Sequence, residues 1–168
     1  MSKKRQDAEG NDIVLSKNSV NILSAETSDI DEWMKLVAIV ADDFPGLDKL
    51  EYEKVLLESI HNKTALCAKS QNRIIGILLF SLDNNTLSFI AVHPDFREKD
   101  IASKLIGEML KNFSQNQKVW VTTYRDGDGK GTAARLLYKK LGFVEDELVE
   151  EFGYPCQKFV FSCDKRNR

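Results

Sequence analysis

The amino-acid sequence predicts a mixed α+β fold in one domain. Four segments place apolar residues at helical spacing, and seven shorter segments are rich in β-forming residues and separated by turn signals. A chain of 168 residues is long enough for one hydrophobic core, and no internal repeat or low-complexity linker divides it. We therefore expect one domain over residues 18–168, preceded by a tail at residues 1–17.

The N-terminal part of this domain predicts one strand and two helices. Residues 20–24 alternate weakly and predict a strand, after which Ser28 stands before an acidic first turn and an apolar pattern of helical period. This pattern predicts a helix at residues 29–40. Pro45 interrupts it, and a second helix is expected at residues 49–60.

The middle of the chain predicts three adjacent antiparallel strands. Residues 64–70 and 73–80 flank Gln71-Asn72 as the arms of a hairpin. A second turn at Asn84-Asn85 leads into residues 86–92, which alternate as a strand does.

The C-terminal half adds two helices and three strands. A helix at residues 100–113 precedes a strand at 118–124, and this strand, helix, strand order implies a parallel crossover. A short helix at 132–141 ends at a glycine. Two strands, at 143–152 and 156–162, complete the chain.

Composition excludes several classes of protein. Twenty-four basic against 26 acidic side chains give a net charge of −2, which argues against a nucleic-acid-binding surface. The longest apolar run, residues 74–80, is far shorter than the roughly 20 residues that span a bilayer. Three cysteines without CxxC spacing and two histidines predict no metal site and a reduced, cytoplasmic setting. Residues 1–17 lack the apolar core of a secretory signal, so we expect a mobile tail rather than a partner-binding arm.

The glycine-rich loop DGDGKG, residues 126–131, matches two binding motifs poorly. As a calcium loop it has Lys130 and Leu137 at the fifth and twelfth positions, where oxygen ligands are needed. As a phosphate loop it lacks the Ser or Thr that should follow the lysine. We expect a flexible polar connection.

The histidines and cysteines do not indicate catalysis by themselves. His93 stands before a proline in a turn, which favours exposed polar surface over a general base. Cys67 and Cys163 lie in apolar strands and are expected to be packed thiols rather than nucleophiles.

The segment HPDFREKDIASKLI, residues 93–106, joins a proline-bounded turn to the start of a helical pattern. A helix N-terminus offers unpaired backbone N–H groups and a partial positive charge, which suit a phosphate. Asp100 places a carboxylate where such an anion would approach. The residues alone leave two interpretations open, a phosphate cradle and an acid-capped surface helix.

Two segments in this order resemble the GCN5-related N-acetyltransferase (GNAT) family: LSFIAVHPDFREKDIASKLI and, later, AARLLYKKLGF. In the first, Arg97 and Ala102 match the ends of the family's turn pattern, R/Q-x-x-G-x-G/A. The second matches A-x-x-x-Y-x-K-x-G-F through Ala134, Tyr138, Lys140, Gly142 and Phe143. The resemblance covers the chain from Val20 to Cys163 and implies a mixed, mostly antiparallel seven-stranded sheet flanked by about four helices.

The resemblance implies acetyl-CoA as co-substrate and no metal. Its pantetheine arm would pair with Ile90, Ala91 and Val92, and the Val92 N–H would be the oxyanion donor. Tyr138 would give a proton to the departing thiolate, and Lys140 would border the cofactor. The diphosphate would lie on the backbone at the helix start, which comprises Arg97, Glu98, Lys99, Asp100, Ile101, Ala102 and Ser103.

Two residues depart from the family pattern. Asp100 replaces the central glycine, and Gly131 stands where an asparagine is often found. Glycine permits positive φ and close backbone approach, which aspartate does not supply cheaply. The resemblance implies an N-acetyltransferase acting by direct attack on a primary amine. The alternative is a non-catalytic acyl-CoA-binding or interaction module on the same fold.

The sequence gives fewer indications of the acceptor amine than of the cofactor. Asp42, Asp43 and Asp48, between the first two helices, would attract a cationic amine. Glu150 or Glu151, near the final hairpin, would do the same. A small-molecule amine and a protein amine both remain candidates, and the resemblance is compatible with a homodimer.

Overall fold

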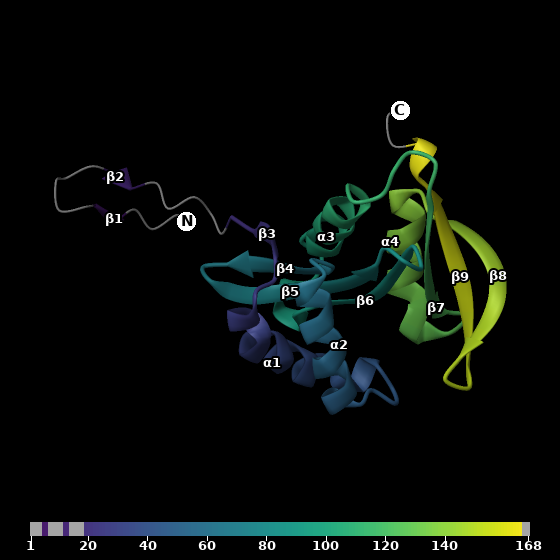
Figure 1. Ribbon diagram of the computed structural model, residues 1–168, viewed down its shortest axis with the longest axis horizontal. Helices are drawn as coiled ribbons and strands as arrows, with labels where there is room; N and C mark the ends of the chain where they lie inside the picture. The colour runs from purple at the N-terminus through teal and green to yellow at the C-terminus, as the bar shows by residue number, and fades with distance from the viewer. Residues whose placement is uncertain (1–4, 7–11, 14–18, 166–168) are drawn as a thin grey trace.

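The computed structural model describes residues 5–6, 12–13 and 19–165 (Figure 1). Near the N-terminus, β1 (Arg5–Gln6) and β2 (Asp12–Ile13) pair antiparallel in a sheet of their own. The expected mobile tail at residues 1–17 otherwise lies outside the described residues.

The domain is built on a seven-stranded sheet in the order β3-β4-β5-β6-β7-β9-β8. All neighbouring strands are antiparallel except β6 and β7, which are parallel. This confirms the predicted α+β class and its mostly antiparallel sheet. The strands are β3 (Asn21–Ser24), β4 (Ala65–Ser70), β5 (Arg73–Ser81), β6 (Thr86–Val92), β7 (Lys118–Tyr124), β8 (Val144–Glu151) and β9 (Tyr154–Ser162).

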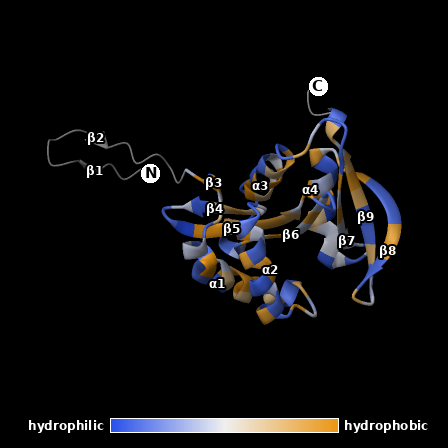
Figure 2. Cartoon of the chain, viewed as in Figure 1, coloured by the Kyte–Doolittle hydropathy of each residue, from blue (hydrophilic) through white to orange (hydrophobic). Residues whose placement is uncertain are grey.

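Helices cover both faces of this sheet (Figure 1). On one face, α1 (Ile30–Val40) and α2 (Lys49–His61) enclose a core with Ile77 of β5; on the other, α3 (Ile101–Leu110) and α4 (Thr132–Leu141) enclose a second core with Leu78. Adjacent strand residues alternate between faces, which is why one strand supplies both cores. Figure 2 shows apolar residues running along the central strands. Among the described residues, no helix has the length and apolarity that a bilayer crossing requires.

The start of the first helix differs from the prediction. Glu26 and Asp29 form a capping box around a 3₁₀ turn, and the Glu26 N–H donates to Asp29 Oδ2 at 2.8 Å. Asp29 also pairs with Lys69 of β4 at 2.6 Å, which ties the helix start to the sheet. Ser28 therefore does not cap the helix, because Glu26 and Asp29 already close its first turn.

Gly76 on β5 lets α3 approach the sheet closely. A Cβ atom at this position would lie 2.9 Å from Ile101 Cγ2 and 3.1 Å from Leu105 Cδ1. Both contacts belong to the first turns of α3, the helix that follows the segment of residues 93–100. The missing side chain at Gly76 thus allows the first turns of α3 to lie close to the sheet.

We expect Gly76→Val to lower the free energy of unfolding by about 1–3 kcal/mol, because overpacking must move α3 or its side chains. Urea unfolding measures this change. Gly107→Ala is the matched control. Gly107 lies in α3 with open space around its Cβ position, so this substitution should stabilise the protein slightly. Equal stability of Gly76→Val and wild type would refute the close approach.

Candidate active site

The parallel strands β6 and β7 are joined at one end only. Their register consists of one partner pair in the described strands, Thr86 with Trp120, and the Trp120 N–H donates to Asn85 O at 2.9 Å. Beyond this pair the strands diverge toward Val92 and Tyr124. We call the resulting opening the splay.

The hydrogen-bond pattern of β5 and β6 decides which backbone groups face the splay. The His93 N–H donates to Ile75 O at 2.8 Å, so these two residues form a hydrogen-bonded pair. Because such pairs alternate in an antiparallel ladder, Val92 opposite Gly76 is a non-hydrogen-bonded position. The N–H and C=O of Val92 and Ile90 therefore point away from β5 and into the splay, whereas those of Ala91 belong to the ladder.

A cavity of about 440 Å³ opens beside the splay. It brings together four segments that are distant in sequence: the end of β6, the turn into α3 with the start of that helix, one side of α4 and the α1–α2 loop. Nearly all of the expected cofactor residues line it. The lining residues are Asp43, Phe44, Ile90, Ala91, Val92, Phe96, Arg97, Glu98, Asp100, Ile101, Ala102, Ser103, Ala133, Ala134, Leu137 and Lys140.

The start of α3 presents free backbone donors to this cavity. Ile101, Ala102 and Ser103 are the first three helical residues, and helix geometry leaves their N–H groups without an acceptor in the helix. The first intrahelical bond runs from Lys104 N–H to Asp100 O at 3.0 Å. Asp100 does not cap these amides with its side chain, which excludes the acid-capped arrangement.

Two residues of the turn adopt the left-handed conformation. Glu98 has φ 62° and Asp100 has φ 60°. The chain thus makes the bend that a glycine would make freely, at a cost of about 1–2 kcal/mol for each non-glycine residue. The Asp100 carboxylate lies 3.5 Å from Lys140 Nζ of α4, in a pair that is largely exposed at the cavity mouth.

Arg97 links the cavity to the α1–α2 loop. Its Nε donates to Val92 O and its Nη2 to Asp43 Oδ2, both at 3.2 Å. On the other arm of the splay, the Tyr124 hydroxyl donates to Asp43 O at 3.2 Å. Asp43 therefore bridges the ends of both arms, and Arg97 retains further N–H donors for an anion.

Two of the expected cofactor residues do not line the cavity. Lys99 places its ammonium 5.2 Å from the centre of the Phe96 ring. Tyr138 is buried, with ring centroids 5.6 Å from Phe143 and 5.8 Å from Phe159. Burial raises the pKa of the Tyr138 phenol, so it stays protonated throughout the neutral range.

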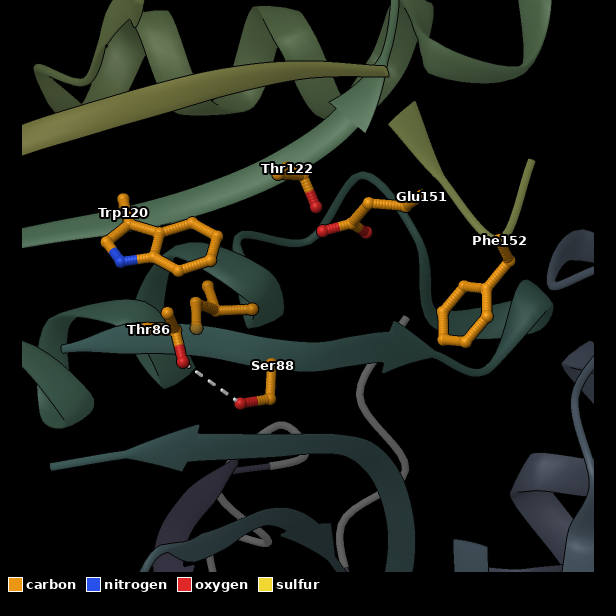
Figure 3. Close-up of a pocket in the computed structure, with 7 residues that line it drawn as sticks. Thr86, Ser88, Trp120, Thr122, Glu151 and Phe152 are labelled. Atoms are coloured by element: carbon orange, nitrogen blue, oxygen red, sulfur yellow. Dashed lines mark hydrogen bonds between the residues drawn. The ribbon is translucent and has the colours of Figure 1, made fainter. Parts of the chain in front are cut away.

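A second cavity, of about 360 Å³, lies on the face of the sheet away from α3 and α4, and Figure 3 shows the residues that line it. Thr86, Leu87, Ser88, Trp120, Thr122, Glu151 and Phe152 line it. Trp120 and Thr122 alternate along β7 with Val119 and Val121, which belong to the core beneath α3 and α4. Figure 3 shows the Glu151 carboxylate and the Thr122 hydroxyl turned toward each other across this cavity.

Phe152 is strained and fully exposed at the rim of this cavity. It occupies the turn between β8 and β9 with φ 51°, a conformation unusual for a bulky residue, and its exposed fraction is 103%. Such strain is commonly retained where a side chain has a function. Asp42 lines neither cavity, Glu150 lies on β8 away from both, and Asp48 accepts from the Leu50 and Glu51 N–H groups as the N-cap of α2.

The prediction that His93 is exposed is wrong. His93 is 8% exposed, because the turn folds its ring against Phe96, 5.6 Å away between centroids. Its Nδ1 accepts from the Asp95 N–H at 3.1 Å, and Nε2 lies 3.2 Å from Arg73 Nη2. The ring thus holds the turn rather than facing the splay.

The cysteines are packed as predicted. Cys67, Cys156 and Cys163 are all buried, and burial raises the pKa of the Cys67 thiol to about 11. Within the described residues, no group of three or more His, Cys, Asp or Glu side chains is placed to hold a metal ion.

Residue 131 is a glycine because it packs closely against Tyr124 at the end of β7. A Cβ atom there would lie 2.8 Å from Tyr124 Cβ and 3.1 Å from Tyr124 O. The preceding loop ends in a 3₁₀ turn (Gly129–Gly131) whose Lys130 N–H donates to Asp128 Oδ1 at 3.0 Å. Close packing on Tyr124 therefore accounts for the glycine.

Sequence reasoning missed several lining residues. Phe44, Ala133 and Leu137 belong to elements that it placed correctly, but nothing local showed that they meet at one cavity. The polar residues Thr86 and Thr122 carried a usable signal, since they interrupt apolar strands at alternate positions.

Comparison with known proteins identifies the family. The model of the acetyltransferase (GNAT) domain matches residues 61–145, and the chain belongs to this family. No curated protein matches the chain in sequence.

Solved structures share the fold. A GNAT-family acetyltransferase from Bacillus cereus is 25% identical, with 86% of this chain and 97% of that one covered at a TM-score of 0.68. The ribosomal-protein-S18-alanine N-acetyltransferase from Escherichia coli is 20% identical, with 84% and 91% covered and a TM-score of 0.60. Arabidopsis thaliana Naa50 in complex with the bisubstrate analogue CoA-Ac-MVNAL is 15% identical, with 86% and 99% covered and a TM-score of 0.66.

We expect Asp100→Gly to raise the free energy of unfolding by up to about 1 kcal/mol, because relief of the left-handed strain exceeds the entropy that glycine adds to the unfolded chain. Chemical denaturation measures the change. Asp100→Ala is the control, since it also loses the contact with Lys140 but keeps a Cβ atom. Equal stabilities of the two variants would show that the strain is absent.

Proposed function

We propose that this protein is an N-acetyltransferase that moves the acetyl group of acetyl-CoA to a primary amine by direct attack. One observation carries the proposal: the free N–H groups at the start of α3 and the inward-facing backbone of Val92 border the same cavity. The first suits a diphosphate and the second suits an extended amide arm that ends at a thioester. Membership of an acetyltransferase family supports the same function.

The cavity matches the parts of acetyl-CoA in order. The diphosphate would lie on Ile101, Ala102 and Ser103, with Arg97 and Lys140 supplying positive charge nearby. The pantetheine amides would pair with the backbone of Ile90 and Val92. Apolar lining from Ala134 and Leu137 would exclude water from the arm.

The reaction needs a neutral amine, an oxyanion donor and a proton for the thiolate. The Val92 N–H points into the splay, where it can stabilise the negative charge that develops on the thioester oxygen. Tyr138 follows Ala134 by one helical turn, and its raised pKa keeps it a proton donor. We assign it the proton that the CoA thiolate receives.

The second cavity is the proposed acceptor side. It lies across the sheet from the α3 and α4 face, so an amine bound there would approach the thioester through the splay. Glu151 would attract the cationic form of the amine, and the hydroxyls of Thr86, Ser88 and Thr122 would orient it. Asp43, which lines the proposed cofactor cavity, contributes a further carboxylate.

A CoA-binding module without turnover is the second candidate. The burial of Tyr138 away from both cavities favours it, since the proton donor would have to move to reach the thiolate. Acetyl-CoA binding without transfer to any amine is the result that this candidate expects.

Calorimetry with acetyl-CoA, followed by mass spectrometry of a panel of amines, tests the proposal. Ala102→Asp is the diagnostic variant, because a carboxylate suits a helix N-terminus yet repels a diphosphate. We expect binding by wild type and a loss of more than about tenfold in affinity for this variant, or roughly 1.4 kcal/mol. Absence of binding by wild type at millimolar acetyl-CoA would refute the function.

We expect Tyr138→Phe to lower kcat by roughly 10²-fold, the lower end of the range for a lost general acid, with little change in acetyl-CoA affinity. The ring keeps its packing on Phe143 and Phe159, so stability should hold. Steady-state kinetics and calorimetry separate the two effects. Wild-type turnover by this variant would remove Tyr138 as the proton donor.

We expect Glu151→Gln to raise KM for a cationic amine about fivefold, or roughly 1 kcal/mol, with little change in kcat. Glu150→Gln, the adjacent carboxylate outside the cavity, is the matched control and should behave as wild type. Added salt should shrink the difference between the variants. A similar effect from both substitutions would place the acceptor elsewhere.

A further inference from the structure

We propose that the protein acetylates its own Lys130, a reaction that rests on the function proposed above. The Lys130 ammonium lies over two aromatic rings, 5.9 Å from the centre of Tyr124 and 5.5 Å from that of Tyr154. The two rings meet edge to face at 5.1 Å. This places a primary amine of the chain at the end of β7, on the face that carries the proposed acceptor cavity.

Lys130 is linked to the proposed cofactor cavity through Tyr124 and Asp43. Tyr124, beneath its ammonium, donates its hydroxyl to Asp43 O at 3.2 Å, and Asp43 lines the proposed cofactor cavity. On the other side, Ala133 lines the same cavity and follows Lys130 by three residues. The four-carbon stem of a lysine gives its amine several ångströms of reach from this position.

Two glycines leave open space around the loop that carries Lys130. Gly127 has φ 87°, and the Cβ positions of Gly127 and Gly129 face open space. Asp128 holds the loop at its base, accepting from the Lys130 N–H at 3.0 Å and from the Tyr154 hydroxyl at 2.8 Å. The backbone is therefore anchored while the side chain of Lys130 is exposed.

The Lys130 ammonium forms no ion pair with the described residues. Within the described chain, no carboxylate lies within 4.0 Å of Lys130 Nζ, whereas Lys139, Lys140 and Lys158 pair with carboxylates at 2.7, 3.5 and 3.8 Å. Movement of the Lys130 side chain toward a thioester therefore breaks no ion pair, only its contacts with two rings.

The reaction balances without another reactant. Lys130 Nζ releases one proton to solvent, and its lone pair forms a bond to the thioester carbonyl carbon. The carbon–sulfur bond then breaks, and the nitrogen gives up a second proton as the CoA thiolate becomes a thiol. The products are N-acetyl-lysine at position 130 and CoA, and the positive charge over Tyr124 and Tyr154 is lost.

Site-resolved mass spectrometry of the full-length protein after incubation with acetyl-CoA tests this proposal. Lys99 is the internal reference, because its ammonium also lies on a ring and has no salt bridge in the described part, but it sits at the diphosphate end. We expect Lys130 to be acetylated at least about tenfold faster than Lys99, since a tethered amine has a high effective concentration. The modified fraction should not depend on protein concentration. Equal rates at the two lysines, or a rate that rises with protein concentration, would overturn the proposal.

Two variants separate this reaction from its alternatives. Lys130→Arg keeps a cation on the rings and should lose the acetyl group at that position. Ala102→Asp should abolish the preference for Lys130 while leaving slow chemical acetylation of Lys99, and a preference that persists would overturn the proposal. If wild type acetylates the amine panel but not Lys130, this inference alone fails. If it acetylates neither, the proposed function fails with it.

Discussion

The active-site architecture depends on one constraint, the single partner pair that joins the parallel strands β6 and β7. If further pairs followed Thr86 and Trp120, the backbone groups of β6 beyond residue 88 would form hydrogen bonds with β7. Because the strands diverge instead, the Val92 N–H is not used by the sheet, while the Val92 C=O accepts from Arg97 Nε. A β-bulge lies near the point where the divergence starts. Leu79 pairs with Phe89 and Phe80 pairs with Leu87, so Ser88 is an extra residue in β6. Such a bulge bends the strand.

The proposed cofactor cavity is bordered by both positive and negative groups, so an anion there would be attracted by some and repelled by others. Helix N–H groups and the side chains of Arg97 and Lys140 favour an anion, while Asp43 and Asp100 already neutralise part of that charge. Arg97 contacts both the cavity and the α1–α2 loop. If a diphosphate binds in this cavity as proposed, its binding and the position of this loop would be coupled through the Arg97 guanidinium.

For the acetyltransferase proposed above, two cavities on opposite faces of the sheet suit direct attack better than a covalent enzyme intermediate. An amine bound in one and a thioester bound in the other would meet through the splay, as proximity catalysis requires. The cysteines that a covalent route would need are buried, and the pKa of Cys67 is raised to about 11. The carboxylate of Glu151 lines the cavity from which a cationic acceptor would come.

The sequence by itself determined the order of helices and strands, the family motifs and most residues that line the proposed cofactor cavity. Helical and strand periodicity and the turn pattern depend on a few neighbouring residues, so they can be recognised without the tertiary structure. The sequence did not determine that His93 is buried, that Arg97 engages Asp43, or that Glu151 rather than Glu150 lines the second cavity. Those outcomes depend on strand register and on contacts between distant segments. Only the tertiary structure could decide them, because a shift of one residue would reverse which side chains face each cavity.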